Sequence, residues 1–256
     1  MLTPNIPIVK SAASNKKSFL PDEFSLLCWN IQKENLKKEF TPLIQNWKKA
    51  YSIEMVLLQE ARFFKTLSSI ADFPFVAAAN LSLFGHFSGV LTAASVYPFS
   101  SQYKMTKARE AFITTRKSTL ITLYTFKDQS LLMVINIHAI NFRSLACYKL
   151  ELSRLHGLIN LHKGPVILAG DFNCWRKSRK EILDEFACSL NLEHTRPRFS
   201  RHVKKWFGHR LDRVYSKGLI LLDVKALDCK SFSDHNPIIV TFAQPEKKEP
   251  KNMEVQ

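Results

Sequence analysis

Short apolar segments recur along most of the chain, separated by polar or amphipathic stretches. Several consist almost entirely of aliphatic and aromatic residues, as strands buried on both faces do. They predict strands at 24–31, 53–60, 89–95, 118–126, 131–139, 165–173, 211–216, 219–227 and 237–242. The ranges 118–126 and 131–139 flank a short polar segment, and this arrangement predicts a hairpin.

Three amphipathic segments between these strands predict helices. In 40–51, Thr41 and Pro42 suit the N-cap and the first helical position. The range 181–190 is the second, and 145–161 is the third, with an apolar face formed by Leu145, Tyr148, Leu152, Leu155 and Ile159. Because hairpins and strand–helix–strand units occur together, the pattern favours a mixed-sheet α/β sandwich over a purely parallel sheet.

The domain boundaries follow from composition. Neither a repeat nor a linker interrupts the chain between its two polar ends, so we expect a single domain over 23–243. Residues 1–22 are polar and carry three prolines, which predicts a loose lead-in. Residues 244–256 are charged and almost without apolar side chains, which predicts a disordered tail.

The charge and cysteine content indicate the partners and the compartment. A net charge of +15 favours a polyanion, either nucleic acid or an anionic membrane face, although a basic surface also serves solubility. No apolar run reaches the roughly 18 residues of a membrane helix, and no signal-peptide core is present. The five cysteines are widely spaced and contain no CxxC pair, so the sequence suggests neither a disulfide framework nor a zinc site. We therefore expect a cytoplasmic monomer, with export by a non-cleaved signal left open.

Polar side chains stand at the ends of several apolar strands. Each alone is an ordinary strand cap, but strands of a sheet end side by side, so the set can converge on one point. Its members are Asn30, Glu60, His138, Asp171, Asn173, Asp212 and the pair Asp234–His235. Carboxylate and amide oxygens suit Mg²⁺, and histidines titrate near neutrality. The inventory covers the activated water, the charge neutralisation and the leaving-group help that hydrolysis of a phosphodiester needs.

These residues lie in motifs that resemble a known family. In chain order, the motifs are WNIQ (29–32), LQE (58–60), NIHA (136–139), GDFN (170–173), LDRVY (211–215) and SDHNP (233–237). Their order is that of the endonuclease/exonuclease/phosphatase superfamily, which includes DNase I, abasic-site endonucleases, cytolethal distending toxin B subunits, neutral sphingomyelinases and inositol polyphosphate 5-phosphatases. The patterns NIHAxNF, AGDFNxW and FGxxLDxV are most similar to the poorly characterised bacterial YafD-like branch. The resemblance implies a four-layered α/β sandwich, with two mixed sheets face to face and helices outside.

The resemblance also implies a metal site. Glu60 would be the main Mg²⁺ carboxylate, with Mn²⁺ as a substitute and Asn30 nearby on the metal or on phosphate. Asp234 would coordinate the metal or lie just behind its ligands. Many abasic-site enzymes carry Asp where this chain has Gln32, and the amide puts a second metal at this edge in doubt.

The resemblance implies catalytic roles for five further residues. His235 would be the general base that deprotonates water, with Asp212 orienting it as in a triad. His138 would be a general acid or a phosphate-stabilising donor. Asp171 and Asn173 would position the water and the scissile phosphate.

Five further residues are candidates for substrate contact. Arg62 follows Glu60 as in a DNA-contacting QExR pattern, and Arg143 follows the NIHAxNF pattern that contains Asn141; both arginines are equally interpretable as surface residues. Trp206 and Arg210 lie in the stretch 194–210, which has six Lys/Arg, three His and no carboxylate. Basic and aromatic groups interleaved in this way suit nucleic acid or an anionic lipid interface.

The sequence thus predicts a Mg²⁺-dependent phosphodiester hydrolase, with DNA or RNA as the leading substrate. Two alternatives within the superfamily remain, a phosphoinositide or sphingolipid hydrolase and a small-metabolite phosphatase. A catalytically dead binding module requires missing catalytic residues, and none is missing.

Overall fold

The computed structural model describes residues 8–11, 17–109, 116–141, 143–197, 205–206 and 209–246. Two mixed β-sheets form its centre. In spatial order, the seven-stranded sheet contains β1 (Ile8–Lys10), β4 (Phe75–Leu83), β5 (His86–Ala94), β3 (Ile53–Phe63), β2 (Glu23–Asn30), β15 (Ile238–Ala243) and β14 (Ile220–Ala226). The six-stranded sheet contains β10 (Glu193–Thr195), β13 (Asp212–Lys217), β9 (Val166–Asp171), β8 (Leu131–His138), β7 (Ser118–Thr125) and β6 (Ser100–Met105). A separate pair consists of β11 (Lys205–Trp206) and β12 (His209–Arg210).

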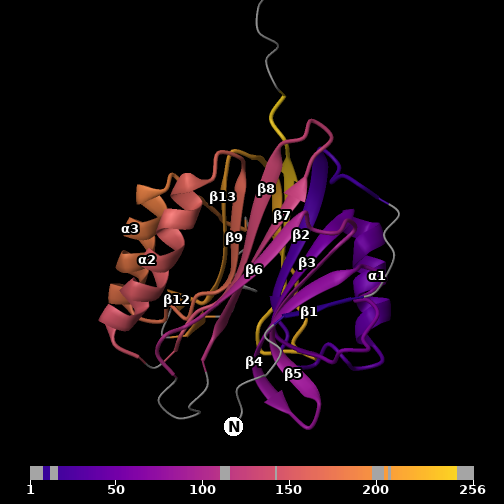
Figure 1. Ribbon diagram of the computed structural model, residues 1–256, viewed down its shortest axis with the longest axis horizontal. Coiled ribbons are helices and arrows are strands. Elements are labelled where there is room, and N and C mark those ends of the chain that lie inside the picture. Colours follow the sequence, from indigo (N-terminus) through magenta and orange to yellow (C-terminus); the bar gives the residue numbers. More distant parts are fainter. Residues whose placement is uncertain are drawn as a thin grey trace, which may run out of the picture.

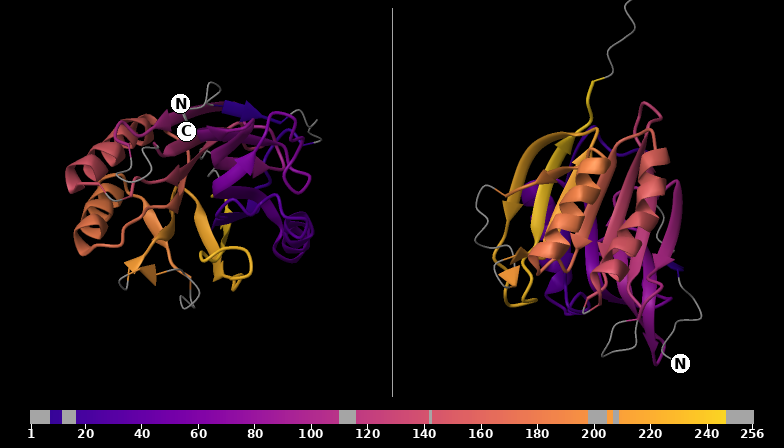
Figure 2. Two further views of the ribbon diagram at one scale, coloured as in Figure 1. Left: turned by 90° about the horizontal axis from the view of Figure 1, so that it is seen from below. Right: turned by 90° about the vertical axis from the view of Figure 1, so that its left-hand side faces the viewer.

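Three apolar layers hold four structural layers together. One core lies between the sheets and includes Leu26 and Cys28 of β2 with Val134 of β8. The alternate β2 residues Leu27 and Trp29 pack on the other side, in the core beside α1 (Phe40–Tyr51). A third core joins the six-stranded sheet to α2 (Leu145–Leu161) and α3 (Lys177–Ser189). Figure 1 and the left view of Figure 2 show α1 on one flank and α2 with α3 on the other, which confirms the four-layered sandwich.

The predicted strands and helices are all present. The predicted ranges 40–51 and 145–161 coincide with α1 and α2, whereas the other elements have at least one shifted end. Helix α1 begins at Phe40 after the N-cap Glu39, so Thr41 and Pro42 lie inside its first turn and the predicted cap is wrong. Proline is tolerated there because first-turn N–H groups have no partner within the helix. The sequence pattern did not predict β1, β4 and β6, nor the short strands β10, β11 and β12. Strand β4 contains three Ala and one Asn, which are poor strand formers, and it is held by pairing with β5.

The predicted loose lead-in is wrong for part of residues 1–22. Strand β1 pairs antiparallel with β4, and Leu20 is fully buried. The start of the predicted tail is also tied down, because the backbone N–H of Gln244 donates to the Asp22 carbonyl at 2.7 Å. Residues 247–256 lie outside the described part. No helix among the described residues is long and apolar enough to cross a membrane.

Candidate active site

Four strand ends from both sheets meet at the lower edge of the molecule in Figure 1. Strands β2 and β3 are parallel neighbours, as are β8 and β9, and the β8–β9 register places His138 beside Asp171. Gly170 permits this approach, because a Cβ there would lie 1.9 Å from the Ile137 carbonyl oxygen. Across the two sheets, Asn30 Nδ2 donates to Asp171 Oδ2 at 3.1 Å. The predicted convergence of these side chains is therefore present.

A buried histidine–carboxylate pair lies beside this contact. Strand β13 pairs with β9 so that Asp212 faces Asp171 in register. His235 Nδ1 lies 2.7 Å from Asp212 Oδ2, and His235 Nε2 lies 4.0 Å from Asp171 Oδ2. The three side chains are all buried. The imidazole therefore has one nitrogen on Asp212 and the other toward Asp171.

The loop that carries His235 is fixed to β2. Ser233 Oγ donates to the Asn30 carbonyl at 2.7 Å and accepts the His235 backbone N–H at 3.1 Å. Trp29 Nε1 donates to the His235 carbonyl at 2.7 Å. The first and third residues of the SDH motif are thus tied to the WN motif, which fixes the position of the imidazole.

Glu60 enters the site through an irregularity in β3. Its φ of 52° is left-handed, and the pairing with β5 shifts register between Leu58 and Ala61. Its side chain is 31% exposed, and its Oε1 lies 3.8 Å from His138 Nε2. His138 Nε2 also lies 3.7 Å from Asp171 Oδ2. A β-bulge often redirects a side chain toward an active site, and here it directs a carboxylate to the shared edge.

Burial and neighbouring charges shift the titration of two groups. Burial raises the pKa of Asp171, and the Asp212 carboxylate raises it further, while His235 opposes the rise. Burial lowers the pKa of His138 well below its usual range, helped by Lys117 and His235. His138 is therefore a neutral imidazole near pH 7, able to donate or accept a hydrogen bond.

Asn173 has most of its polar groups engaged within the loop after β9. Its φ is 48°, and its backbone N–H donates to Asp171 Oδ1 at 2.9 Å. Its Nδ2 donates to the Ala139 carbonyl at 3.0 Å, which joins this loop to the one after β8. Asn173 therefore fixes one oxygen of Asp171 and holds two site loops together.

The oxygen donors at this edge suit a hard divalent cation. Ligand atoms of Asp171, Asp212 and His235 lie within 4.8 Å of one another, and the buried Asp212 Oδ1 has no hydrogen-bond partner among the described residues. Nδ1 of His235 is already bonded to Asp212, so this trio fits a catalytic pair beside a carboxylate better than a metal cage. The more open Glu60 carboxylate leaves room for the waters that Mg²⁺ retains.

Asp234 stands at the rim of the site. Its side chain is 56% exposed, and its Oδ1 lies 3.8 Å from His235 Nε2. Gln32 Oε1 accepts the Asp234 backbone N–H at 3.1 Å. The amide that replaces the aspartate of many abasic-site enzymes thus ties the Asp234 loop to the WNIQ motif.

Two residues to which the sequence analysis gave no role join the two sheets beside the candidate site. Gln59 Nε2 donates to Asn136 Oδ1 at 2.7 Å across the two sheets. Asn136 Nδ2 in turn donates to the Leu91 carbonyl at 2.9 Å. Both residues lie inside the LQE and NIHA motifs. In these motifs, the sequence indicated roles only for Glu60 and His138. Their buried amides satisfy each other, so they specify how the sheets align under the site.

A third missed residue, Arg179 of α3, is almost fully buried. Its NH1 donates to the carbonyls of Ile140 at 2.8 Å and Asn173 at 3.1 Å, and its NH2 donates to that of Arg143 at 3.0 Å. Its guanidinium also lies over the Tyr148 ring, 4.7 Å from the centroid. No sequence signal points to this role, because Arg179 lies within an ordinary basic run.

The predicted substrate residues differ in their surroundings. Arg62 is exposed at the end of β3, and Arg143 is exposed with its Nε bonded to the Arg109 carbonyl. Asn141 Oδ1 accepts Trp175 Nε1 at 2.7 Å, which gives it a structural partner. The basic and aromatic stretch is only partly described. Of its two predicted contact residues, Arg210 is half-buried, and Trp206 is described by its backbone alone.

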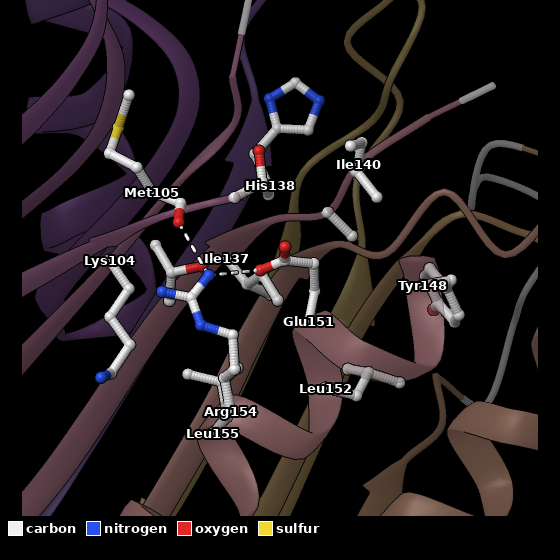
Figure 3. Close-up of a pocket in the computed structure, with 13 residues that line it drawn as sticks. Lys104, Met105, Ile137, His138, Ile140, Tyr148, Glu151, Leu152, Arg154 and Leu155 are labelled. Carbon is white, nitrogen blue, oxygen red and sulfur yellow. Dashed lines mark hydrogen bonds and ion pairs between the residues drawn. The ribbon is translucent and has the colours of Figure 1, made fainter. Parts of the chain in front are cut away.

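A cavity that His138 lines is too small for a substrate. Figure 3 shows it between β6, β8 and α2, with Arg154 bonded to Glu151 and to the Met105 carbonyl, both at 2.9 Å, and the His138 ring turned away from that pair. Its volume is about 20 Å³, room for roughly one or two water molecules. The candidate site therefore lies outside this cavity, at the sheet edge where Asn30 and Asp171 meet.

Comparison with known proteins places this arrangement in a family. A family model described as the Endonuclease/Exonuclease/phosphatase family matches residues 27–235. The UPF0294 protein of Yersinia enterocolitica is 37% identical over 222 residues, covering 85% of this chain and 82% of that protein, which confirms the resemblance to the YafD-like branch. An endonuclease/exonuclease/phosphatase from Beutenbergia cavernae superposes with a TM-score of 0.65 at 14% identity, covering 87% of this chain and 72% of that one. D. rerio TDP2 complexed with single-strand DNA product superposes with a TM-score of 0.56 at 16% identity, covering 88% and 100%. The chain therefore belongs to the endonuclease/exonuclease/phosphatase family.

Proposed function

We propose that this protein is a Mg²⁺-dependent phosphodiester hydrolase that acts on nucleic acid. The proposal rests on one observation: the His235–Asp212 pair meets Asp171, His138 and the partly exposed Glu60 at a single sheet edge. The family itself is defined by endonucleases, exonucleases and phosphatases.

His235 is the proposed general base. Asp212 accepts its Nδ1–H at 2.7 Å, which leaves Nε2 as the lone-pair nitrogen that takes a proton from the attacking water. Asp171 lies 4.0 Å from Nε2, close enough to orient that water. Asn173 supports it by donating its backbone N–H to Asp171.

His138 is the proposed donor to the scissile phosphate. Its lowered pKa makes it neutral near pH 7, so it does not supply a proton as an imidazolium. Of its two expected roles, hydrogen-bond donation to a phosphate oxygen is the one that its electrostatics support.

Glu60 would hold Mg²⁺, or Mn²⁺ in its place, with Asn30 and Asp234 adjacent. The metal, when bound, neutralises charge on the phosphate oxygens. The Asn30 amide is itself held in place, because its Nδ2 donates to Asp171 and its Oδ1 accepts the Gln32 backbone N–H at 3.2 Å. These groups present hard oxygen atoms, the donor type that Mg²⁺ prefers.

Two observations favour nucleic acid as the substrate. The net charge of +15 provides sequence-independent attraction to a phosphate backbone. A structural relative, TDP2, was solved with a single-strand DNA product.

A substrate panel tests the proposal. Purified protein with Mg²⁺ is incubated with supercoiled plasmid, single-stranded DNA, RNA, phosphoinositides and bis-p-nitrophenyl phosphate, beside His235→Ala. We expect cleavage of a nucleic acid that is lost in the variant. Cleavage unchanged in His235→Ala would refute the mechanism, and turnover of phosphoinositide alone would assign the site to lipid phosphates.

A further inference from the structure

The hairpin that joins β4 to β5 projects from the edge that carries the candidate site. Figure 1 and the right view of Figure 2 show it reaching below the ends of the two sheets. Its turn consists of Phe84 and Gly85, between the paired residues Leu83 and His86. Both turn residues have positive φ, 48° and 79°. Two central residues with positive φ are the mark of a type I′ turn, which matches the twist of a hairpin.

Phe84 is an unfavourable residue for this position. The first central residue of a type I′ turn is usually Asn, Asp or Gly, because a larger side chain at positive φ costs about 1–2 kcal/mol. The Phe84 side chain is also 93% exposed, so no packing within the chain offsets that cost. A residue that is both strained and exposed is a reason to look for a contact with another molecule.

One face of the hairpin lies on the side of the six-stranded sheet, which carries His138 and Asp171. Phe63 and Phe87 are opposite each other in register and pack in the core beside α1. Side chains alternate along a strand, so Arg62, which pairs with Ser88, lies on the other face, toward the six-stranded sheet. His86 is two residues from Ser88 and shares this face.

This face carries the polar residues Arg62, His86 and Ser88 together with Leu81 and Leu83, and it continues into β3, the strand of Glu60. Arg62 is exposed and lies two residues from Glu60 on β3. The large exposed apolar groups are confined to the tip, at Leu83 and Phe84, which are 51% and 93% exposed. So small an apolar tip beside a cationic, hydrogen-bonding face suits a base and its phosphates better than it suits an acyl layer, which takes a wider apolar surface.

Building on the proposed function, we propose that the β4–β5 hairpin is the arm that holds nucleic acid beside the site. Phe84 stacks on the base of a nucleotide that flanks the scissile phosphate, and Arg62 contacts a phosphate between that base and Glu60. Stacking on an aromatic ring is sequence-tolerant because every base has a π-face.

Equilibrium binding tests the arm separately from cleavage. In a His235→Ala background, the affinity for a fluorescein-labelled DNA oligonucleotide is measured by anisotropy. Phe84→Ala should weaken it by about 5- to 100-fold, whereas Phe84→Trp should retain it. Phe99→Ala is the matched control, because Phe99 is 73% exposed but lies between β5 and β6 at the opposite edge. Equal affinity of Phe84→Ala and its parent would overturn the proposal.

Two more measurements separate the remaining outcomes. Phe84→Asn should melt at a higher temperature while binding the oligonucleotide more weakly, which distinguishes loss of the ring from loss of the fold. The indole that Phe84→Trp adds should change its emission on adding oligonucleotide; a change only with phosphatidylglycerol vesicles would overturn the proposal in favour of a lipid surface. Phe84-dependent binding without cleavage of any nucleic acid by the wild-type protein would support the arm and overturn the proposed function.

Discussion

His235 is oriented by Asp212, which precedes it by 23 residues, rather than by its sequence neighbour Asp234. Nδ1 of the imidazole lies 2.7 Å from Asp212 Oδ2, on the side away from the open edge. The Asp234 carboxylate lies instead 3.8 Å from Nε2, and its side chain is mostly exposed. The two aspartates therefore lie beside opposite nitrogens of one ring. Replacing Asp212 by Asn should have different consequences from replacing Asp234 by Asn.

Asp212→Asn should abolish most of the activity while preserving the fold. The amide keeps the shape but can donate to Nδ1, which moves the imidazole proton to Nε2 and removes the proposed base. We expect kcat on bis-p-nitrophenyl phosphate to fall by about four orders of magnitude, as in a comparable triad. Asp22→Asn, on the exposed segment before β2, is the control. A fall of less than about tenfold, with a normal melting temperature, would refute the orienting role.

Glu60→Gln should weaken metal binding. The amide keeps one oxygen donor but loses the charge, so the Mg²⁺ concentration for half-maximal activity should rise by at least about tenfold. In the wild-type protein, chelation with EDTA should remove activity, and Mg²⁺ should raise the melting temperature by binding the native state. That thermal shift should shrink in Glu60→Gln and persist in the control Glu23→Gln at the start of β2. Equal shifts in both variants would place the metal elsewhere.

Much of the fold and of the candidate site was predictable because both depend on local patterns. The strand β9 and its GDFN end are contiguous in sequence, as are β2 with Asn30 and β8 with His138. A buried strand is apolar on both faces, so the polar residue that ends it stands out. The order of the motifs then supplied the remaining members, including Asp212 and His235.

The rest depended on tertiary contacts that no local pattern records. Asn141 was predicted to meet substrate, yet its amide accepts the indole N–H of Trp175, a pairing that only the folded loops bring about. Phe84 sat in a stretch with no predicted element, and its left-handed turn is visible only once β4 pairs with β5. Arg179 lay in a basic run, a pattern typical of a solvated helix face, but the fold buries it.

Arg179→Met should lower both stability and activity. The change leaves buried carbonyls of Ile140 and Asn173 without donors, which should reduce the free energy of unfolding by about 3 kcal/mol in urea. Because Asn173 then loses its anchor, kcat should fall about 100-fold with KM little changed, even where the protein is fully folded. Arg179→Lys, which restores one donor, should recover part of kcat. Normal kcat in folded Arg179→Met would limit Arg179 to a structural role.

His194 should make the fold sensitive to mild acid. Its ring stacks on Tyr215 at 4.9 Å, and burial lowers its pKa to about 3, helped by Arg213, Arg196 and Arg210. The unfolded chain, with a pKa near 6.5, therefore binds this proton first as the pH falls. Stability attributable to neutral His194 is complete above pH ~6.5 and is lost progressively down to pH ~3.

His194→Phe removes this proton while keeping an aromatic ring against Tyr215. In urea unfolding, the free energy of the variant relative to the wild-type protein should rise by about 2 kcal/mol between pH ~7 and pH ~4.5. All other titrating groups are common to the two proteins, so their contributions cancel in this difference. If the free energies of unfolding of the two proteins change in parallel with pH over that interval, His194 gains its proton without unfolding the strand β10 that carries it.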